Sequence, residues 1–139
     1  MSATSKLYTP EVLALTTALA DYPLYDALEL RGAVRSPVCG SALELGLELD
    51  SSTRIVGIGM KVSACAIGQA AAALFVQSAK NCSKSDVQFA LAQIEAWLRR
   101  DRAELPDWRG LDAIASARDY PGRHGAIVLP WKAALALLP

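Results

Sequence analysis

The sequence lacks an excess of charge of either sign, a long apolar run and an N-terminal signal core. Its 139 residues include 14 basic and 14 acidic residues, so the formal net charge is zero. A neutral chain has no overall electrostatic attraction to nucleic acid, so we expect no nucleic-acid partner. No apolar run reaches the roughly 20 residues of a membrane span, and residues 1–10 lack the apolar core of a signal peptide. We therefore expect a cytoplasmic protein with no membrane partner.

Metal-binding and nucleophilic side chains are also scarce, with three cysteines and one histidine. In a reducing compartment such thiols bind metals, react or are simply buried. No CxxC or HxxxH spacing is present, which excludes a zinc-finger arrangement. There is no serine–histidine–acid set, and Gly57-Ile58-Gly59 lacks the third glycine and the following helix of a nucleotide loop. We expect a carrier or scaffold rather than a stand-alone enzyme.

What is present is an ordinary globular composition, 53% hydrophobic and 20% charged. The length is that of one domain, which we place at residues 1–139. Thr9 and Pro10 begin a first helix. Period-two alternation then predicts three strands with one solvent-exposed face, over residues 28–35, 43–49 and 55–62.

Helical patterns follow the strands. A nearly all-apolar stretch, residues 65–80, predicts a buried helix, and residues 85–100 predict an amphipathic one. A shorter helix is expected after Asp107 and a last one from about Pro130. The predicted fold class is α+β: an N-terminal helix, a three-stranded antiparallel meander, then several helices packed on one sheet face.

Two cysteines lie at positions that suit chemistry. Cys39 is in a loop shaped by Pro37 and Gly40 between the first two strands. Cys65 lies where the third strand meets the buried helix, and the positive end of a helix dipole favours a thiolate. Because the first and third strands of a meander run parallel, both junctions should lie at the same end of the sheet. The alternative is that each thiol is a small buried hydrophobe, and for Cys82 that alternative is favoured.

Four segments carry a family resemblance. They are residues 8–12 (YTPEV), residues 37–40 (PVCG), residues 64–67 (ACAI) and the stretch from Tyr120 through Leu135. Their order and spacing resemble the iron–sulfur cluster assembly scaffold family (IscU, NifU N-terminal and SufU). The extra helical stretch between Cys65 and Arg123 is similar to the SufU branch. The resemblance implies that fold over nearly the whole chain.

The resemblance also implies a site and partners. In that family three cysteines and an aspartate hold a nascent [2Fe–2S] cluster or a zinc ion and accept sulfur from a cysteine desulfurase, for delivery to acceptor proteins. Cys39 and Cys65 match the first two cysteines. Ser41 stands at the aspartate position and Ala126 at the third cysteine, and neither is a competent replacement.

His124 lies two positions before Ala126, and an imidazole is a good zinc ligand and a cluster ligand in Rieske sites. Its alternative is an exposed loop histidine. Arg123 could stabilise a thiolate or persulfide, or could cap a turn. Three functions stay open: a scaffold that binds iron or a labile cluster, a sulfur relay with or without zinc, and a docking or regulatory module without metal.

Overall fold

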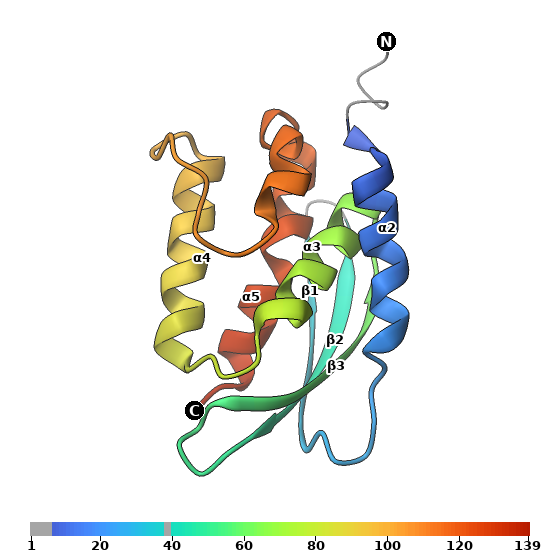
Figure 1. The fold of residues 1–139 in the computed structure, drawn as a ribbon, viewed down its shortest axis with the longest axis vertical. Coiled ribbons are helices and arrows are strands. Elements are labelled where there is room, and N and C mark those ends of the chain that lie inside the picture. The colour runs from blue at the N-terminus through green and yellow to red at the C-terminus, as the bar shows by residue number, and fades with distance from the viewer. Residues whose placement is uncertain (1–6, 38–39) are drawn as a thin grey trace.

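The computed structural model describes residues 7–37 and 40–139, and it shows the α+β fold that the sequence predicts (Figure 1). The strands form one antiparallel sheet in the order β1-β2-β3. The elements, in chain order, are α2 (Pro10–Ala18), η1 (Leu19–Asp21), β1 (Leu30–Arg35), β2 (Ala42–Leu49), β3 (Ile55–Ser63), α3 (Ala66–Ser78), α4 (Lys84–Leu98), η2 (Leu111–Asp119), η3 (Pro121–Arg123) and α5 (His124–Leu137), where η denotes a 3₁₀ helix.

Helix starts follow the predicted capping residues. The Thr9 hydroxyl accepts a hydrogen bond of 3.2 Å from the Val12 backbone N–H, and Pro10 occupies the first position of α2. Ser83 and Asp86 form a reciprocal capping box at the start of α4. Each cap satisfies backbone N–H groups that lack a partner within the helix. These local signals explain why sequence and structure agree closely on where both helices begin.

The sheet buries its leucine face under the helices. Leu43, Leu45 and Leu47 of β2 are nearly inaccessible to solvent. The register pairs Leu45 with Met60 of β3 and with Gly32 of β1. Helix α5 packs on β1 and β2, and α3 packs on β3. This face therefore forms the floor of the core.

Part of the opposite face, which the sequence predicted to be solvent-exposed, is covered by residues 22–28. The Met60 N–H donates a hydrogen bond of 2.9 Å to the Tyr22 carbonyl. A side chain at Gly59 would collide with the Pro23 backbone, so glycine is required for this close approach. Leu28, at the other end of the crossing, is 1% exposed. The covering segment has no periodic pattern, and the alternation of the strands alone could not reveal it.

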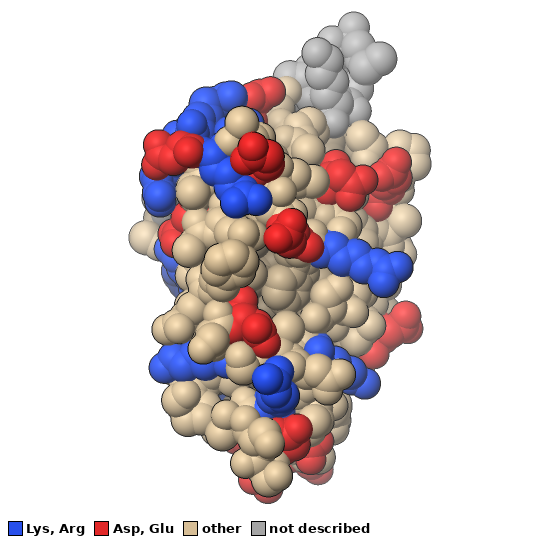
Figure 2. Space-filling model, turned by 60° about the vertical axis from the view of Figure 1, so that its left-hand side comes forward, with Lys and Arg blue, Asp and Glu red and all other residues tan. Residues whose placement is uncertain are grey.

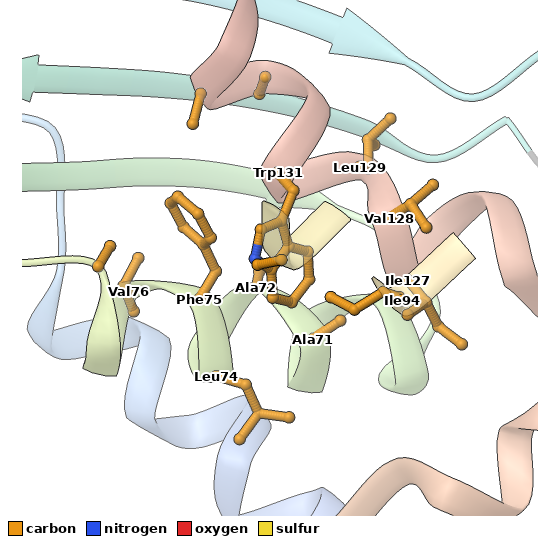
Figure 3. Close-up of a cluster of buried hydrophobic side chains, with 14 of the residues drawn as sticks. Ala71, Ala72, Leu74, Phe75, Val76, Ile94, Ile127, Val128, Leu129 and Trp131 are labelled. Atoms are coloured by element: carbon orange, nitrogen blue, oxygen red, sulfur yellow. The ribbon is translucent and has the colours of Figure 1, made fainter. Parts of the chain in front are cut away.

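The core between α3 and the C-terminal half of the chain is built on small and aromatic residues. Ala71 and Ala72 of α3 are completely buried and lie toward Trp131 of α5 (Figure 3). Phe75 stacks on Trp108 with ring centroids 5.5 Å apart, and Trp131 meets both rings edge-on. The Trp108 indole N–H donates to the Leu74 carbonyl at 2.8 Å. This aromatic cluster, Phe75, Trp108 and Trp131, fixes α5 against α3.

The prediction that the last helix starts near Pro130 is wrong. Helix α5 begins at His124, and Pro130 lies inside it. Proline is favoured in the first turn because it has no N–H to donate, and this preference suggested the later start. Burial of the segment from Ala126 to Trp131 against α3, α4 and the sheet outweighs the one hydrogen bond that Pro130 cannot make. The longer helix brings His124 to the region of the candidate site.

Candidate functional site

The two segments that carry the predicted cysteines lie at the same end of the sheet. Arg35, the last residue of β1, pairs with Ala42 at the start of β2, and Ala42 pairs with Ser63 at the end of β3. The β1–β2 loop and the β3–α3 junction therefore leave the sheet side by side. The strand-direction argument made from the sequence is confirmed for the residues that flank the two cysteines.

The loop between β1 and β2 is closed by its own backbone. The Ser36 N–H donates to the Ser41 carbonyl at 2.8 Å, and the Gly40 N–H donates to the Ser36 carbonyl at 3.0 Å. Gly40 has a φ of 73°, which favours glycine. Ser41 is buried at the base of the loop, with 5% of its surface exposed. Cys39 lies outside the described residues, so its placement in this loop stays a prediction.

Cys65 is the N-cap residue of α3, as predicted. Its backbone is extended, its carbonyl accepts the first helical hydrogen bond from the Gln69 N–H at 2.9 Å, and its side chain makes no capping bond. The residue is half-buried and its thiol is free. The first turn of α3 contains no acidic residue. The Cys65 thiol therefore lies at the positive end of the α3 dipole. No carboxylate of the first turn of α3 offsets that positive charge.

The start of α5 reaches both of these segments. A Cβ built on Gly125 would lie 2.5 Å from the Ser36 hydroxyl oxygen, so the start of the helix approaches the loop closely and a side chain here would require the serine to move. A Cβ on Gly68, three residues after Cys65, would lie 3.1 Å from the Ala126 Cβ. Gly125 and Ala126 therefore lie between the β1–β2 loop and the first turn of α3, and His124 directly precedes them. Three segments that are far apart in sequence converge at one place.

His124 is half-buried at the first position of α5. Its Nε2 lies 2.8 Å from the backbone carbonyl of Arg118. A carbonyl only accepts hydrogen bonds, so Nε2 carries the proton and, in the neutral ring, Nδ1 has the free lone pair. A metal ligand would therefore be Nδ1. Nothing in the sequence pointed to the Arg118 carbonyl, because any residue at that position supplies the same backbone group.

Arg123 lies at the N-cap of α5 and points toward the first helix of the fold. Its Nη2 is 3.3 Å from the Tyr8 hydroxyl. Its Nε is buried and has no hydrogen-bond partner among the described residues. The guanidinium is thus directed to Tyr8, and its predicted role beside the candidate site stays a prediction.

Two expected ligand positions carry no soft donor. Ala126 is only 2% exposed and packs on Gly68, and Ser41 offers a hydroxyl at the base of its loop. Within residues 7–37 and 40–139, no group of three histidine, cysteine or acidic side chains is arranged to hold a metal ion. The predicted set of Cys39, Cys65 and His124 includes a residue outside these ranges, so it stays a prediction.

Cys82 lies at the opposite end of the sheet. Its carbonyl accepts a hydrogen bond from the N–H of Ile55, the first residue of β3, whereas Cys65 follows the last residue of that strand. A strand rises about 3.3 Å per residue, so roughly 25 Å separate the two regions. Desolvation by burial raises the pKa of the Cys82 thiol, and the Asp86 carboxylate adds to the shift. Cys82 therefore does not complete the site.

The surface carries basic and acidic residues interspersed on the face shown in Figure 2. The short basic cluster at the end of α4 is partly neutralised, since Arg99 pairs with Asp101 and Arg100 pairs with Asp119. In the part of the chain that the structure describes, no helix has the length and apolarity to cross a bilayer.

The fold is that of the iron–sulfur cluster scaffold proteins, as the sequence resemblance predicted. The N-terminal domain of a nitrogen-fixing NifU-like protein from Brucella abortus is 19% identical, with a TM-score of 0.85 over 98% of this chain and 94% of that one. A protein from Fervidobacterium islandicum AW-1, described as an iron–sulfur cluster assembly scaffold for the SUF system, is 18% identical, with a TM-score of 0.82 over 96% of this chain and 98% of that one. No protein-family model and no curated protein matches the sequence. These likenesses establish the shared fold.

Proposed function

We propose that this protein is a scaffold-like carrier of iron–sulfur cluster assembly in the cytoplasm. Cys39 and Cys65, with His124 as a third ligand, would bind iron or a labile [2Fe–2S] cluster as cargo. The observation that carries the proposal is the convergence at one end of the sheet of the β1–β2 loop, the Cys65 N-cap and residues 124–126. The shared fold with a NifU-like and a SufU protein supports it.

The chemistry follows from the donors. Thiolates bind iron and zinc, and the imidazole Nδ1 is a donor to either metal. With three protein donors, water, a small thiol or a partner protein supplies the remaining ligand, so the cargo is labile and suited to transfer. The Arg123 guanidinium would stabilise the negative charge that thiolates and sulfide bring to the site.

Sulfur delivery needs fewer donors. A cysteine desulfurase would present a persulfide, and the Cys65 thiolate would attack its terminal sulfur. A new S–S bond forms on Cys65 while the desulfurase thiolate leaves, so no external oxidant or reductant is required. Cluster acceptor proteins would take the product. Zinc, bound by the same donors, would hold the thiolates in place until the desulfurase docks.

A second candidate is a docking or regulatory module that keeps the fold without the chemistry. It is favoured by Ala126, which fills the third cysteine position with a packed methyl group, and by the hydroxyl of Ser41. Such a protein would bind the desulfurase and change its activity without carrying sulfur or iron.

Anaerobic reconstitution with ferrous iron and sulfide tests these alternatives. We expect a visible cluster chromophore that disappears in Cys39→Ala and in Cys65→Ala and persists in Cys82→Ala, the matched control. Mass spectrometry after incubation with a cysteine desulfurase and cysteine should show a gain of one sulfur atom on Cys65 or Cys39. Absence of both signals would refute the carrier and leave the docking module.

A further inference from the structure

Arg118, near the end of η2, holds the segment between α4 and α5 against the end of α4. Its Nε donates to the Trp97 carbonyl at 2.7 Å and its Nη2 donates to the Arg102 carbonyl at 2.8 Å. Its guanidinium carbon also lies 5.3 Å from the centroid of the buried Trp97 ring. Hydrogen bonds from a charged donor are stronger than neutral ones, and the cation–π contact adds to them. One side chain thus makes two contacts with Trp97 at the C-terminal end of α4 and one with Arg102 in the segment that follows it.

The backbone of the same residue contacts the candidate site. The Arg118 carbonyl accepts the Nε2–H of His124 at 2.8 Å. Neighbouring backbone bonds hold this carbonyl in place, because the Tyr120 N–H donates to Ala117 at 3.0 Å and the Arg123 N–H donates to Tyr120 at 2.8 Å. The Arg118 side chain binds the end of α4 and the segment after it, and the Arg118 carbonyl binds the His124 imidazole. Arg118 therefore links α4 to the imidazole.

This arrangement has a chemical consequence for the ring. Histidines that bind metals commonly donate their second ring N–H to a carbonyl or carboxylate, which fixes the tautomer and the ring orientation. Here the donated hydrogen is on Nε2, so Nδ1 is the nitrogen left for a ligand. The acceptor is a backbone carbonyl of the protein itself, so this bond requires no bound ion to orient the ring.

We propose that Arg118 is a positioning residue: its side-chain contacts hold the backbone carbonyl that sets the Nε2–H tautomer of His124, so Nδ1 is the ring nitrogen left for a ligand and the ring orientation depends on how Arg118 is held beside α4. This inference rests on the proposed function only for the identity of the ligand, a soft or borderline metal ion. The tautomer and the ring orientation are properties of the apoprotein.

The single histidine makes the test direct. In ¹⁵N NMR spectra of the neutral ring in the apoprotein, we expect one Nε2–H signal protected from exchange with water. In Arg118→Gln this signal should broaden and the tautomers should approach the mixture of a free imidazole. Arg100→Gln is the matched control: it removes a guanidinium that pairs with Asp119 on the exposed surface, and we expect the ring signal to be unchanged.

Loss of folding must be separated from loss of positioning. Near-UV circular dichroism of the aromatic cluster should be the same in Arg118→Gln as in the parent. If it is not, Arg118→Lys replaces it, because lysine keeps the charge near Trp97 but lacks the fork that reaches two carbonyls. A folded variant of either kind whose Nε2–H stays protected would overturn the inference, as would a parent ring with the proton on Nδ1.

Zinc titration by calorimetry separates this inference from the proposed function. We expect the zinc affinity of Arg118→Gln to be about 10- to 100-fold below that of the parent, the usual effect of removing support for a metal-bound histidine. If the unsubstituted protein binds no zinc but shows the protected Nε2–H signal, the proposed metal site is refuted and the positioning role of Arg118 stands. If the unsubstituted protein and folded Arg118→Gln bind zinc with equal affinity, only the positioning role of Arg118 is refuted.

Discussion

Helix α3 has a cysteine next to each of its ends, and the two thiols lie in different surroundings. Cys65 caps the N-terminus, makes no side-chain hydrogen bond and has no acidic residue in the following turn. Cys82 follows the C-terminus, where its thiol donates to the Ser78 carbonyl at 3.6 Å and lies near Asp86. Burial and the Asp86 carboxylate both raise the pKa of Cys82. The two ends of one helix therefore give the same residue type different electrostatic surroundings.

The largest expected effect is on zinc affinity, and it comes from adding a thiol at position 126, near the N-terminus of α3. Ala126→Cys would add a sulfur next to the first turn of α3, because Ala126 contacts Gly68, the third residue after Cys65. We expect zinc affinity to rise by about 100-fold, because thiolates are strong zinc ligands, while crowding at a packed position lowers stability by about 1–3 kcal/mol. Calorimetric zinc titration measures the first effect and thermal denaturation the second.

Ala134→Cys is the control for this change, since Ala134 is buried on the same helix but away from the site. It should lower stability similarly and leave zinc affinity as it was. Equal zinc affinities for the two variants would show that the three segments do not form one ligand set.

The next change tests the loop that faces Cys65. Ser41→Asp would introduce an acidic residue at a position that is 5% exposed, where the scaffold family that the sequence resembles has an aspartate. Without metal we expect a loss of about 1–3 kcal/mol in the free energy of unfolding, the cost of burying the introduced carboxylate. Excess zinc should reverse part of this loss through binding to the folded state. Chemical denaturation with and without zinc checks both effects, and Ser51→Asp in the exposed β2–β3 turn should change little in either condition.

The contrast between the two thiols can be measured directly. We expect iodoacetamide to alkylate Cys65 at least about ten-fold faster than Cys82 in the folded protein near neutral pH, because the thiolate is the reacting species. Peptide mass spectrometry gives the rate for each cysteine, and the rates should become similar in denaturant. Faster alkylation of Cys82 than of Cys65 would contradict the comparison.

The smallest expected effect concerns Asp86. Hydrogen bonds from the Ser83 backbone and side chain lower the pKa of this carboxyl, so its contribution to stability is present above the unfolded pKa, near 4, and is lost as the pH falls through the folded value. Asp86→Ala should cost about 0.5–1 kcal/mol at pH 7 and less at pH 3. It should also lower the pKa of Cys82 and speed its alkylation a few-fold. An unchanged Cys82 rate would mean that burial alone governs this thiol.

Local signals in the sequence predicted most of the elements but not how distant segments meet. The Thr9 and Ser83 caps and the strand alternation act over a few residues, so they could be identified without the fold. The start of α5 at His124, rather than at Pro130, depends on burial against three other elements. The close approach of Gly125 to Ser36 joins residues 89 positions apart in the chain, and no local pattern encodes it.

In the candidate site, too, local sequence signals predicted some features and long-range contacts determined the others. Cys65 was predicted at the N-terminus of a helix because the change in hydrophobic period lies there, and the structure agrees. The hydrogen bond that orients His124 comes from a backbone carbonyl, which every residue carries, so no residue type marked it. The prediction that Ala126 occupies a ligand position came from the resemblance to a known family and not from periodicity, and it stays a prediction.

The aromatic cluster of Phe75, Trp108 and Trp131 has a consequence for how such a chain can change during evolution. None of the three rings belongs to the candidate ligand set, yet together they hold α3 against α5. The residues that fix the fold are therefore separate from the candidate ligand residues, so single substitutions can change the side chains at that end of the sheet while the backbone positions around them persist. A chain with this architecture can gain or lose a site there without rebuilding its core.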